Sequence, residues 1–215
     1  MIVAVDGPAA AGKGTLARRL AREFNLAYLD TGSLYRAVGL QVMDAGGDPA
    51  DPVAAERAAR SLDLASLDSP RLRDETVADA ASKVAAMPGV RAALLTRQRD
   101  FAEHPPKPYA GAILDGRDIG TTVCPHAGIK LFVTASLEAR AKRRTLELQD
   151  KGIDAIQDRV LADMIVRDER DRGRTAAPLA PAGDALVVDT TDMDADQVFD
   201  LAAELIRGRL AAKVG

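Results

Sequence analysis

Residues 2–15 read Ile-Val-Ala-Val-Asp-Gly-Pro-Ala-Ala-Ala-Gly-Lys-Gly-Thr. The four apolar residues at the start predict a short strand, and apolar positions at four-residue steps across 16–24 predict a helix. Backbone N–H groups and the positive end of a helix dipole converge on an anion in such a strand–loop–helix unit. Because the spacing of Gly7, Gly12 and Lys13 also fits the phosphate-binding pattern, the sequence predicts a nucleoside triphosphate site and not an ordinary glycine turn.

The predicted ATP site is this loop, whose nine residues are Gly7, Pro8, Ala9, Ala10, Ala11, Gly12, Lys13, Gly14 and Thr15. Gly14 departs from the general motif, in which Ser or Thr directly follows the lysine. Here the hydroxyl comes one position later, at Thr15.

Composition limits the classes of protein to consider. The chain has 215 residues, 47% of them hydrophobic and 3% aromatic, so one domain with an aliphatic core is expected. A net charge of −3 argues against a nucleic-acid partner. Cys124 is the single cysteine, which rules out an intrachain disulfide and is typical of a small buried hydrophobe.

The beginning of the sequence leads straight into the first predicted strand. It has no basic region, and no apolar stretch in the chain is long enough for export or for a membrane span. We therefore expect a cytoplasmic protein that has no membrane partner.

Short apolar runs alternate with helical patterns along the chain, which predicts an α/β fold: a five-stranded parallel sheet flanked by helices. The predicted strands are 2–5, 26–29, 112–114, 129–133 and 185–188. Helices are expected after the loop, over 34–42, 75–86 and 90–101, after a cap at Ser136, from Asp154 onward, and over 195–212. Ligands of such sheets bind beyond the carboxyl ends of the strands.

We expect one domain, 1–215, with three regions. Its core comprises 1–47, 109–140 and 183–215, the insert region is 48–108, in which 48–72 are expected to form an insertion at the edge of the sheet, and about 150–182 form a lid.

Arginines recur in several segments: Arg36, Arg91, Arg117, Arg167, Arg170, Arg172 and Arg174. Arginine forks suit both an acceptor phosphate and the charge that develops during phosphoryl transfer. The spacing i, i+3, i+7 places Arg167, Arg170 and Arg174 on one helix face. Because Asp and Glu interleave with these residues, a solvated, salt-bridged face is the alternative. Gly173 and the proline loop after it favour a moving lid. We predict catalytic roles for Lys13, Arg117, Arg170 and Arg174.

Four segments together resemble bacterial cytidylate kinases, within the P-loop nucleoside monophosphate kinases. They are 7–15 (GPAAAGKGT), 30–36 (DTGSLYR), 115–120 (DGRDIG) and 167–172 (RDERDR). The similarity runs nearly end to end. Gly-Lys-Gly-Thr is shared by many nucleoside monophosphate kinases, whereas the second and third segments are more specific.

The resemblance implies roles for individual residues. Arg36, Arg117 and Arg174 match arginines that hold the acceptor phosphate. Ser82, Arg91 and Asp118 match cytosine-reading residues, while Arg167 and Asp171 match residues at the ribose, where a deoxy sugar is tolerated. Thr31 joins this predicted CMP site, and Asp115 matches a carboxylate near magnesium.

Cytosine chemistry agrees with these roles. A carboxylate accepts from the N4 amine, while Ser and Arg donate to N3 and O2. Uracil would turn an O4 acceptor toward Asp118 and leave buried groups unpaired.

The implied reaction transfers the γ-phosphoryl group of ATP to CMP or dCMP with Mg²⁺, in a protein expected to be a monomer. Two alternatives stay open: a P-loop kinase acting on UMP, AMP or a non-nucleotide acceptor, and a nucleotide-binding module that transfers nothing.

Two features depart from the family pattern. Ala10 stands where Ser or Gly is usual, so this position needs a negative φ or carries strain. The family's β-rich insert is shortened to about residues 62–76, where few or no strands are expected.

Overall fold

The computed structural model describes residues 1–211, apart from the side chains at positions 64 and 65. Its centre is a five-stranded sheet in the order β2-β3-β1-β4-β5, and every pair is parallel. The strands are β1 (Ile2–Asp6), β2 (Ala27–Asp30), β3 (Ala112–Gly116), β4 (Ile129–Thr134) and β5 (Leu186–Asp189). The predicted α/β sheet is confirmed.

Several strands continue further than their apolar runs. β2 ends at Asp30 and β3 at Gly116, and the register places Asp30 beside Asp115 and Asp6 beside Gly116. Three aspartates of neighbouring strands therefore meet at the carboxyl edge, where ligands of parallel sheets bind.

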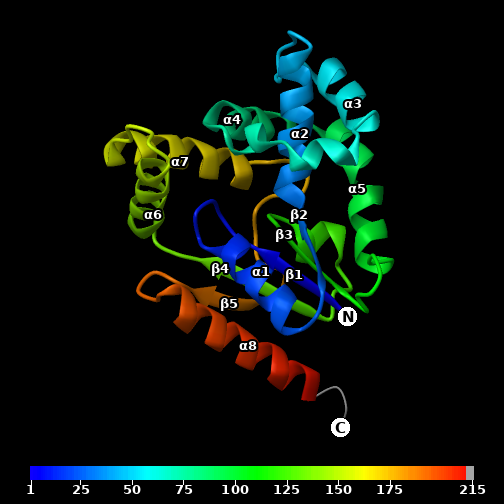
Figure 1. Cartoon of the computed structure of the whole chain (residues 1–215), viewed down its shortest axis with the longest axis vertical. Helices are drawn as coiled ribbons and strands as arrows, with labels where there is room; N and C mark the ends of the chain where they lie inside the picture. Colours follow the sequence, from blue (N-terminus) through cyan, green and yellow to red (C-terminus); the bar gives the residue numbers. More distant parts are fainter. Residues whose placement is uncertain (212–215) are drawn as a thin grey trace.

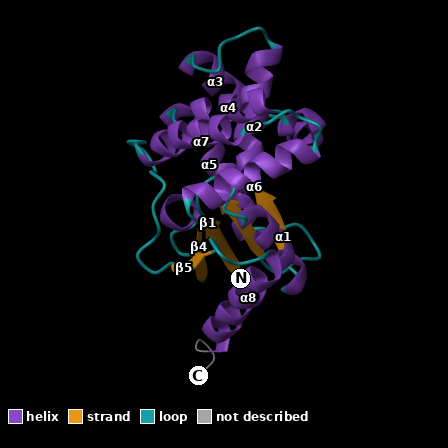
Figure 2. Ribbon diagram, turned by 90° about the vertical axis from the view of Figure 1, so that its left-hand side faces the viewer, coloured by secondary structure: helices purple, strands orange, loops and turns teal. Residues whose placement is uncertain are grey.

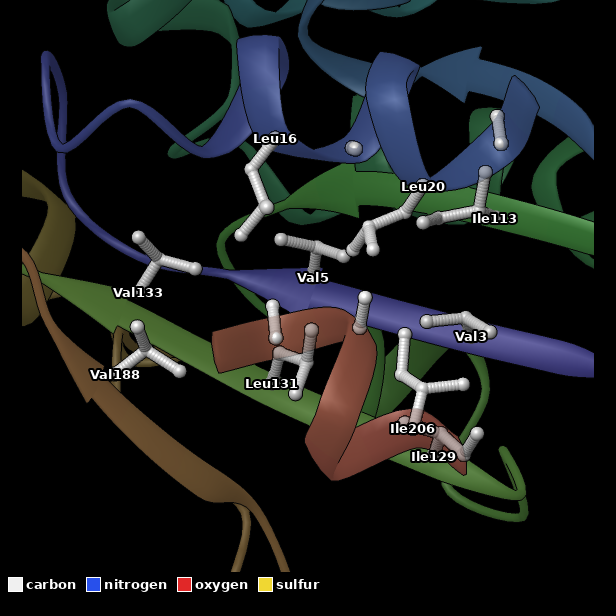
Figure 3. Close-up of a cluster of buried hydrophobic side chains, with 14 of the residues drawn as sticks. Val3, Val5, Leu16, Leu20, Ile113, Ile129, Leu131, Val133, Val188 and Ile206 are labelled. Atoms are coloured by element: carbon white, nitrogen blue, oxygen red, sulfur yellow. The ribbon is translucent and has the colours of Figure 1, made fainter. Parts of the chain in front are cut away.

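One face of the sheet is covered by α1 (Lys13–Glu23) and α8 (Ala195–Ala211) (Figure 1). Leu16 and Leu20 of α1 and Ile206 of α8 pack on Val3 and Val5 of β1, as Figure 3 shows. The four-residue spacing in α1 therefore marks the face that packs on the sheet. The predicted closing helix extended to residue 212, which lies outside the described residues.

The opposite face is covered by α5 (Pro88–Glu103) and by η3 (Ile119–Val123), a single π-helical turn that follows β3. Ile119 and Leu114 are fully buried there. The turn begins directly after Arg117 and Asp118, so its packing determines where the loop that carries them leaves the sheet.

A helical region rises beyond the carboxyl edge and has a hydrophobic cluster of its own (Figures 1 and 2). It consists of α2 (Thr31–Asp44), α3 (Pro52–Arg60), α4 (Glu75–Val84) and the first half of α5. A Cβ on Gly39 would lie 2.9 Å from the Cβ of Ala80, so α2 and α4 approach closely.

The shortened insert forms two 3₁₀ turns, η1 (Leu64–Asp68) and η2 (Pro70–Arg73). Between residues 62 and 76 the structure has no strand, as expected.

The remaining arm is a hairpin of α6 (Leu137–Asp150) and α7 (Gln157–Arg172). Ser136 caps α6 as predicted, accepting from the Ala139 amide at 3.2 Å. The predicted start of α7 at Asp154 is wrong, because the chain turns at Gly152 with φ 76° and is still extended at Ile156. Within residues 1–211, no helix combines the length and apolar character needed to cross a membrane.

The end of α7 also corrects the predicted arginine face. Gly173 caps the helix by donating to the Glu169 carbonyl at 2.8 Å, so Arg174 lies beyond its end. The returning chain is attached there, since the Leu179 amide donates to the Asp171 carbonyl at 3.0 Å. Arg174 reaches Asp171 from a loop, whereas Arg167 and Arg170 stay on the helix.

Candidate active site

The phosphate-binding loop joins β1 to α1 at the carboxyl edge. A Cβ on Gly7 would lie 1.9 Å from the Val133 carbonyl oxygen, so only glycine fits beside β4. Gly12 is the N-cap of α1, with φ 87° and no side-chain hydrogen bond to the first helical amides. No acidic residue lies in the first turn, and Lys13 opens the helix. Free amides, the helix dipole and a lysine therefore make this end of α1 suited to an anion.

Two buried side chains bind the outer carbonyls of this loop. Arg140 donates from Nη1 to the carbonyl of Ala9 at 3.2 Å, and the Thr190 hydroxyl donates to that of Ala11 at 3.2 Å. Because these two hydrogen bonds fix the carbonyls of the loop, they also hold the loop amides in place for a phosphate.

Ala10 has φ 58°, so the negative φ offered as one alternative is wrong and the strained left-handed conformation is present. Its methyl group packs against the cluster in the α6–α7 hairpin that includes Ala141 and Met164. This contact offsets part of the strain and joins the loop to the hairpin.

Gly14 lies against the carboxylate at the end of β3. A Cβ at position 14 would be 3.2 Å from Oδ2 of Asp115, so a larger residue directly after Lys13 would crowd this carboxylate. Tyr28 donates from its hydroxyl to the same oxygen at 2.8 Å. Burial raises the pKa of Asp115, and the nearby Lys13 opposes that shift.

Lys13 is held in an electropositive environment. Burial lowers the pKa of its ammonium to about 8, and repulsion from Arg117 adds to the effect, while Asp115 and Asp30 oppose it. A bound phosphate anion would offset both the cost of burying this positive charge and its repulsion from Arg117.

The residues present also fit a magnesium ion carried by ATP. No group of three or more His, Cys, Asp or Glu within residues 1–211 could hold a metal on its own. Mg²⁺ bound with nucleotides takes only one or two carboxylates beside phosphates and water. Asp115, which is buried and interacts electrostatically with Lys13 of the loop, is an oxygen donor of that kind.

Three arginines gather around one carboxylate opposite the loop. Arg117 donates from Nε to Asp171 at 3.0 Å, and Arg174 binds the other carboxylate oxygen. These cations hold the pKa of Asp171 below its usual value although burial opposes this. Burial and repulsion from Arg117 lower the pKa of Arg167 to about 10. The Nε atoms of Arg167 and Arg174 are buried and have no partner among the described residues. Positive charge therefore exceeds negative charge here.

A second buried pair joins the end of β3 to α5. Arg91 donates to Asp118, and both side chains are at most 10% exposed. Burial raises the pKa of Asp118, while Arg91 and Arg174 oppose the shift. The Arg91 guanidinium lies 5.8 Å from the centre of the buried Tyr35 ring.

Ser82 lies on α4 and is 4% exposed. Its hydroxyl is buried and has no hydrogen-bond partner within the described residues. Arg91 binds the Ala85 carbonyl just past the end of the same helix, at 3.3 Å. A buried hydroxyl without a partner is costly, so it points to a group supplied by a ligand.

Other predicted residues lie at the margin of this cluster. Arg36 pairs with Asp30 at 3.2 Å, and both remain about one-third exposed. Thr31 is buried and donates to the Asp115 carbonyl at 2.8 Å, which makes it a support of the strand end. Arg170 pairs with Asp79 of α4 at 3.3 Å, and both side chains are partly exposed.

Sequence reasoning missed four residues that hold these groups in place: Asp6, Tyr28, Arg140 and Asp168. Arg140 is 2% exposed and donates to Asp168 of α7 at 2.7 Å, which links the loop to the hairpin. The available signal was position, because Asp6 and Tyr28 lie in or at the ends of predicted strands.

The family model and the curated relatives indicate the same family. The cytidylate kinase family model matches residues 3–208. The cytidylate kinase of Paramagnetospirillum magneticum is 62% identical over 205 residues, covering 95% of this chain and 97% of that protein. That of Rhodospirillum rubrum is 58% identical, covering 96% and 97%. The solved shikimate kinase of Bacteroides thetaiotaomicron has a TM-score of 0.51 at 13% identity, covering 96% and 98%, and shares the fold alone. This chain belongs to the cytidylate kinase family.

Proposed function

We propose that this protein transfers the γ-phosphoryl group of ATP to CMP or dCMP, giving ADP and CDP or dCDP. Family membership supports the reaction class. The main structural support for CMP as the acceptor is a buried cluster. In it Asp118 pairs with Arg91, and the Ser82 hydroxyl has no partner among the described residues.

The donor binds at the phosphate-binding loop. Loop amides and the start of α1 bind the phosphates, and Lys13 neutralises charge on the transferred group. Mg²⁺ bound with ATP would lower the charge of the phosphates, and Asp115 would supply an oxygen ligand to it.

The acceptor phosphate binds among Arg36, Arg117 and Arg174. At neutral pH a nucleoside monophosphate is already largely a dianion, so it needs positioning more than deprotonation. When this phosphate engages Arg117 and Arg174, their bonds to Asp171 weaken, and the Asp171 carboxylate becomes free to accept from a ribose hydroxyl. We assign Arg167, whose buried Nε has no partner among the described residues, to the ribose as a further donor. Arg170 and Arg174 on the lid approach the transferred group.

Cytosine is read by three side chains. Asp118 accepts from N4, and Arg91 and Ser82 donate to N3 and O2. Uracil would place its O4 acceptor against Asp118 and its N3–H toward the donor Arg91, leaving the buried carboxylate unpaired, which supports discrimination between the two bases.

The runner-up is a kinase for UMP or AMP, and an ADP-release assay with CMP, dCMP, UMP and AMP separates the two. We expect CMP and dCMP to be used best, and faster turnover of UMP or AMP would overturn the assignment. Asp118→Ala should raise the KM for CMP at least tenfold while the KM for ATP changes little. An equal loss for both substrates would remove the base-reading role of Asp118.

A further inference from the structure

The carboxylate of Asp6 links the donor strand to the acceptor loop. Asp6 is the last residue of β1, directly before Gly7, and it is 4% exposed. Its Oδ1 accepts from the amide of Ile119 and its Oδ2 from the amide of Gly120, both at 2.7 Å. These are the first two amides after Arg117 and Asp118.

This contact supplies hydrogen-bond acceptors that the start of η3 lacks. Asp118 is the N-cap of η3 and makes no side-chain bond to its amides, and the first amides of a helical turn have no partner within the turn. Asp6 supplies both acceptors from a neighbouring strand. A neutral side chain of the same size could not, because an amide offers a single acceptor oxygen.

The surroundings leave little freedom for this contact. A Cβ on Gly120 would lie 3.1 Å from Cδ of Lys130 and 3.4 Å from Oδ2 of Asp6. The charged groups that face Asp6 are Asp118, which repels it, and Arg117, which attracts it. A movement of Asp6 would therefore shift the two side chains that the proposed reaction places at the base and at the acceptor phosphate.

We infer that Asp6 is a positioning residue of the CMP site, holding Arg117 and Asp118 against the strand that leads into the ATP loop. The inference rests on the proposed function for the roles of those two residues. Asp6 touches neither substrate. It acts on the acceptor side through the loop and leaves the donor amides unchanged.

The test is Asp6→Asn, assayed for the KM values of CMP and ATP and for kcat. One charge-assisted bond is lost and an NH₂ faces a backbone N–H, so the KM for CMP should rise about tenfold while that for ATP changes less than twofold. Loss of fold stability alone would lower kcat through the active fraction and leave both KM values unchanged. An unchanged KM for CMP, or an equal rise for ATP, overturns the inference.

Two further measurements keep the outcome clear. Amide hydrogen exchange of Ile119 and Gly120 should accelerate in Asp6→Asn whatever the acceptor is, so the contact is tested apart from the proposed function. Should Asp6→Asn fail to fold, Gly120→Ala crowds the same contact without changing charge and should raise the KM for CMP by a smaller factor. Unchanged exchange, or an unchanged KM in Gly120→Ala, contradicts the inference.

The matched control is Asp189→Asn. Asp189 also ends a strand, and its Oδ1 accepts from the Thr191 amide at 2.9 Å, but it lies on β5. Its substitution should leave the KM for CMP unchanged. A rise equal to that in Asp6→Asn would mean that any strand-end aspartate acts in this way. If Asp118→Ala raises the KM for CMP and Asp6→Asn does not, the inference fails while the proposed function stands.

Discussion

Replacing Ser82 with alanine should weaken CMP binding and stabilise the free protein. The buried hydroxyl has no partner in the described part of the chain, and leaving such a group unpaired costs about 1–3 kcal/mol. Alanine also favours a helix interior by up to about 0.5 kcal/mol. We therefore expect the free energy of unfolding of Ser82→Ala to rise by about 1 kcal/mol in urea denaturation.

The same change removes one of the donors that we propose for cytosine. A neutral hydrogen bond contributes about 0.5–1.5 kcal/mol, so the KM for CMP should rise about two- to twelvefold while the KM for ATP stays constant. Ser61→Ala is the control, because the Ser61 hydroxyl already donates to the Arg57 carbonyl at 3.1 Å. That variant should show no gain in stability and no change in KM. If Ser82→Ala loses stability or leaves the KM for CMP unchanged, Ser82 is an incidental helix residue and the reasoning is refuted.

Two further predictions concern the loop and its strand. Gly7→Ala should destabilise the protein by about 3 kcal/mol or more and abolish ATP binding, because the added Cβ would meet the Val133 carbonyl at 1.9 Å; a wild-type melting temperature with intact ATP binding would argue against the close approach. Burial raises the pKa of Asp6 from 3.8 to about 6, against the pull of the two amides, so folding takes up a proton at acidic pH. The raised pKa of Asp6 therefore contributes fully to the free energy of unfolding below about pH 4, and this contribution is lost as the pH rises through about 6. The difference in unfolding free energy between wild type and Asp6→Asn should therefore shift by about 2 kcal/mol between pH 4 and pH 7, with wild type relatively more stable at pH 4; a difference that does not vary with pH would contradict it.

The fold and the donor loop could be predicted because their signals are local. A short apolar strand, a glycine-rich loop with a lysine and a helical repeat lie within 24 residues. The end of α7 was predicted wrongly, although Gly173 is a common helix stop and could have placed Arg174 beyond it.

The proposed acceptor site has no such local signal. Ser82, Arg91 and Asp118 lie on α4, on α5 and after β3, and tertiary packing brings these elements to the same edge. Only the resemblance to a family could assign them. The role of Asp6 was not predicted even from the resemblance. An aspartate at the end of a strand does not indicate that two amides far away in the sequence will donate to it.

Ala10 shows the same limit at a single residue. Local sterics favour a negative φ for alanine, yet the loop adopts φ 58° while the methyl packs against the α6–α7 hairpin. Packing between distant segments decides the conformation there.

The most direct test of cytosine recognition is a crystal structure of the protein with CMP. We predict that the N4 amine donates to the Asp118 carboxylate, that Ser82 gains the base as its missing partner, and that the phosphate lies among Arg36, Arg117 and Arg174. A structure in which Ser82 remains buried without a partner and the base contacts neither Asp118 nor Arg91 would contradict the account.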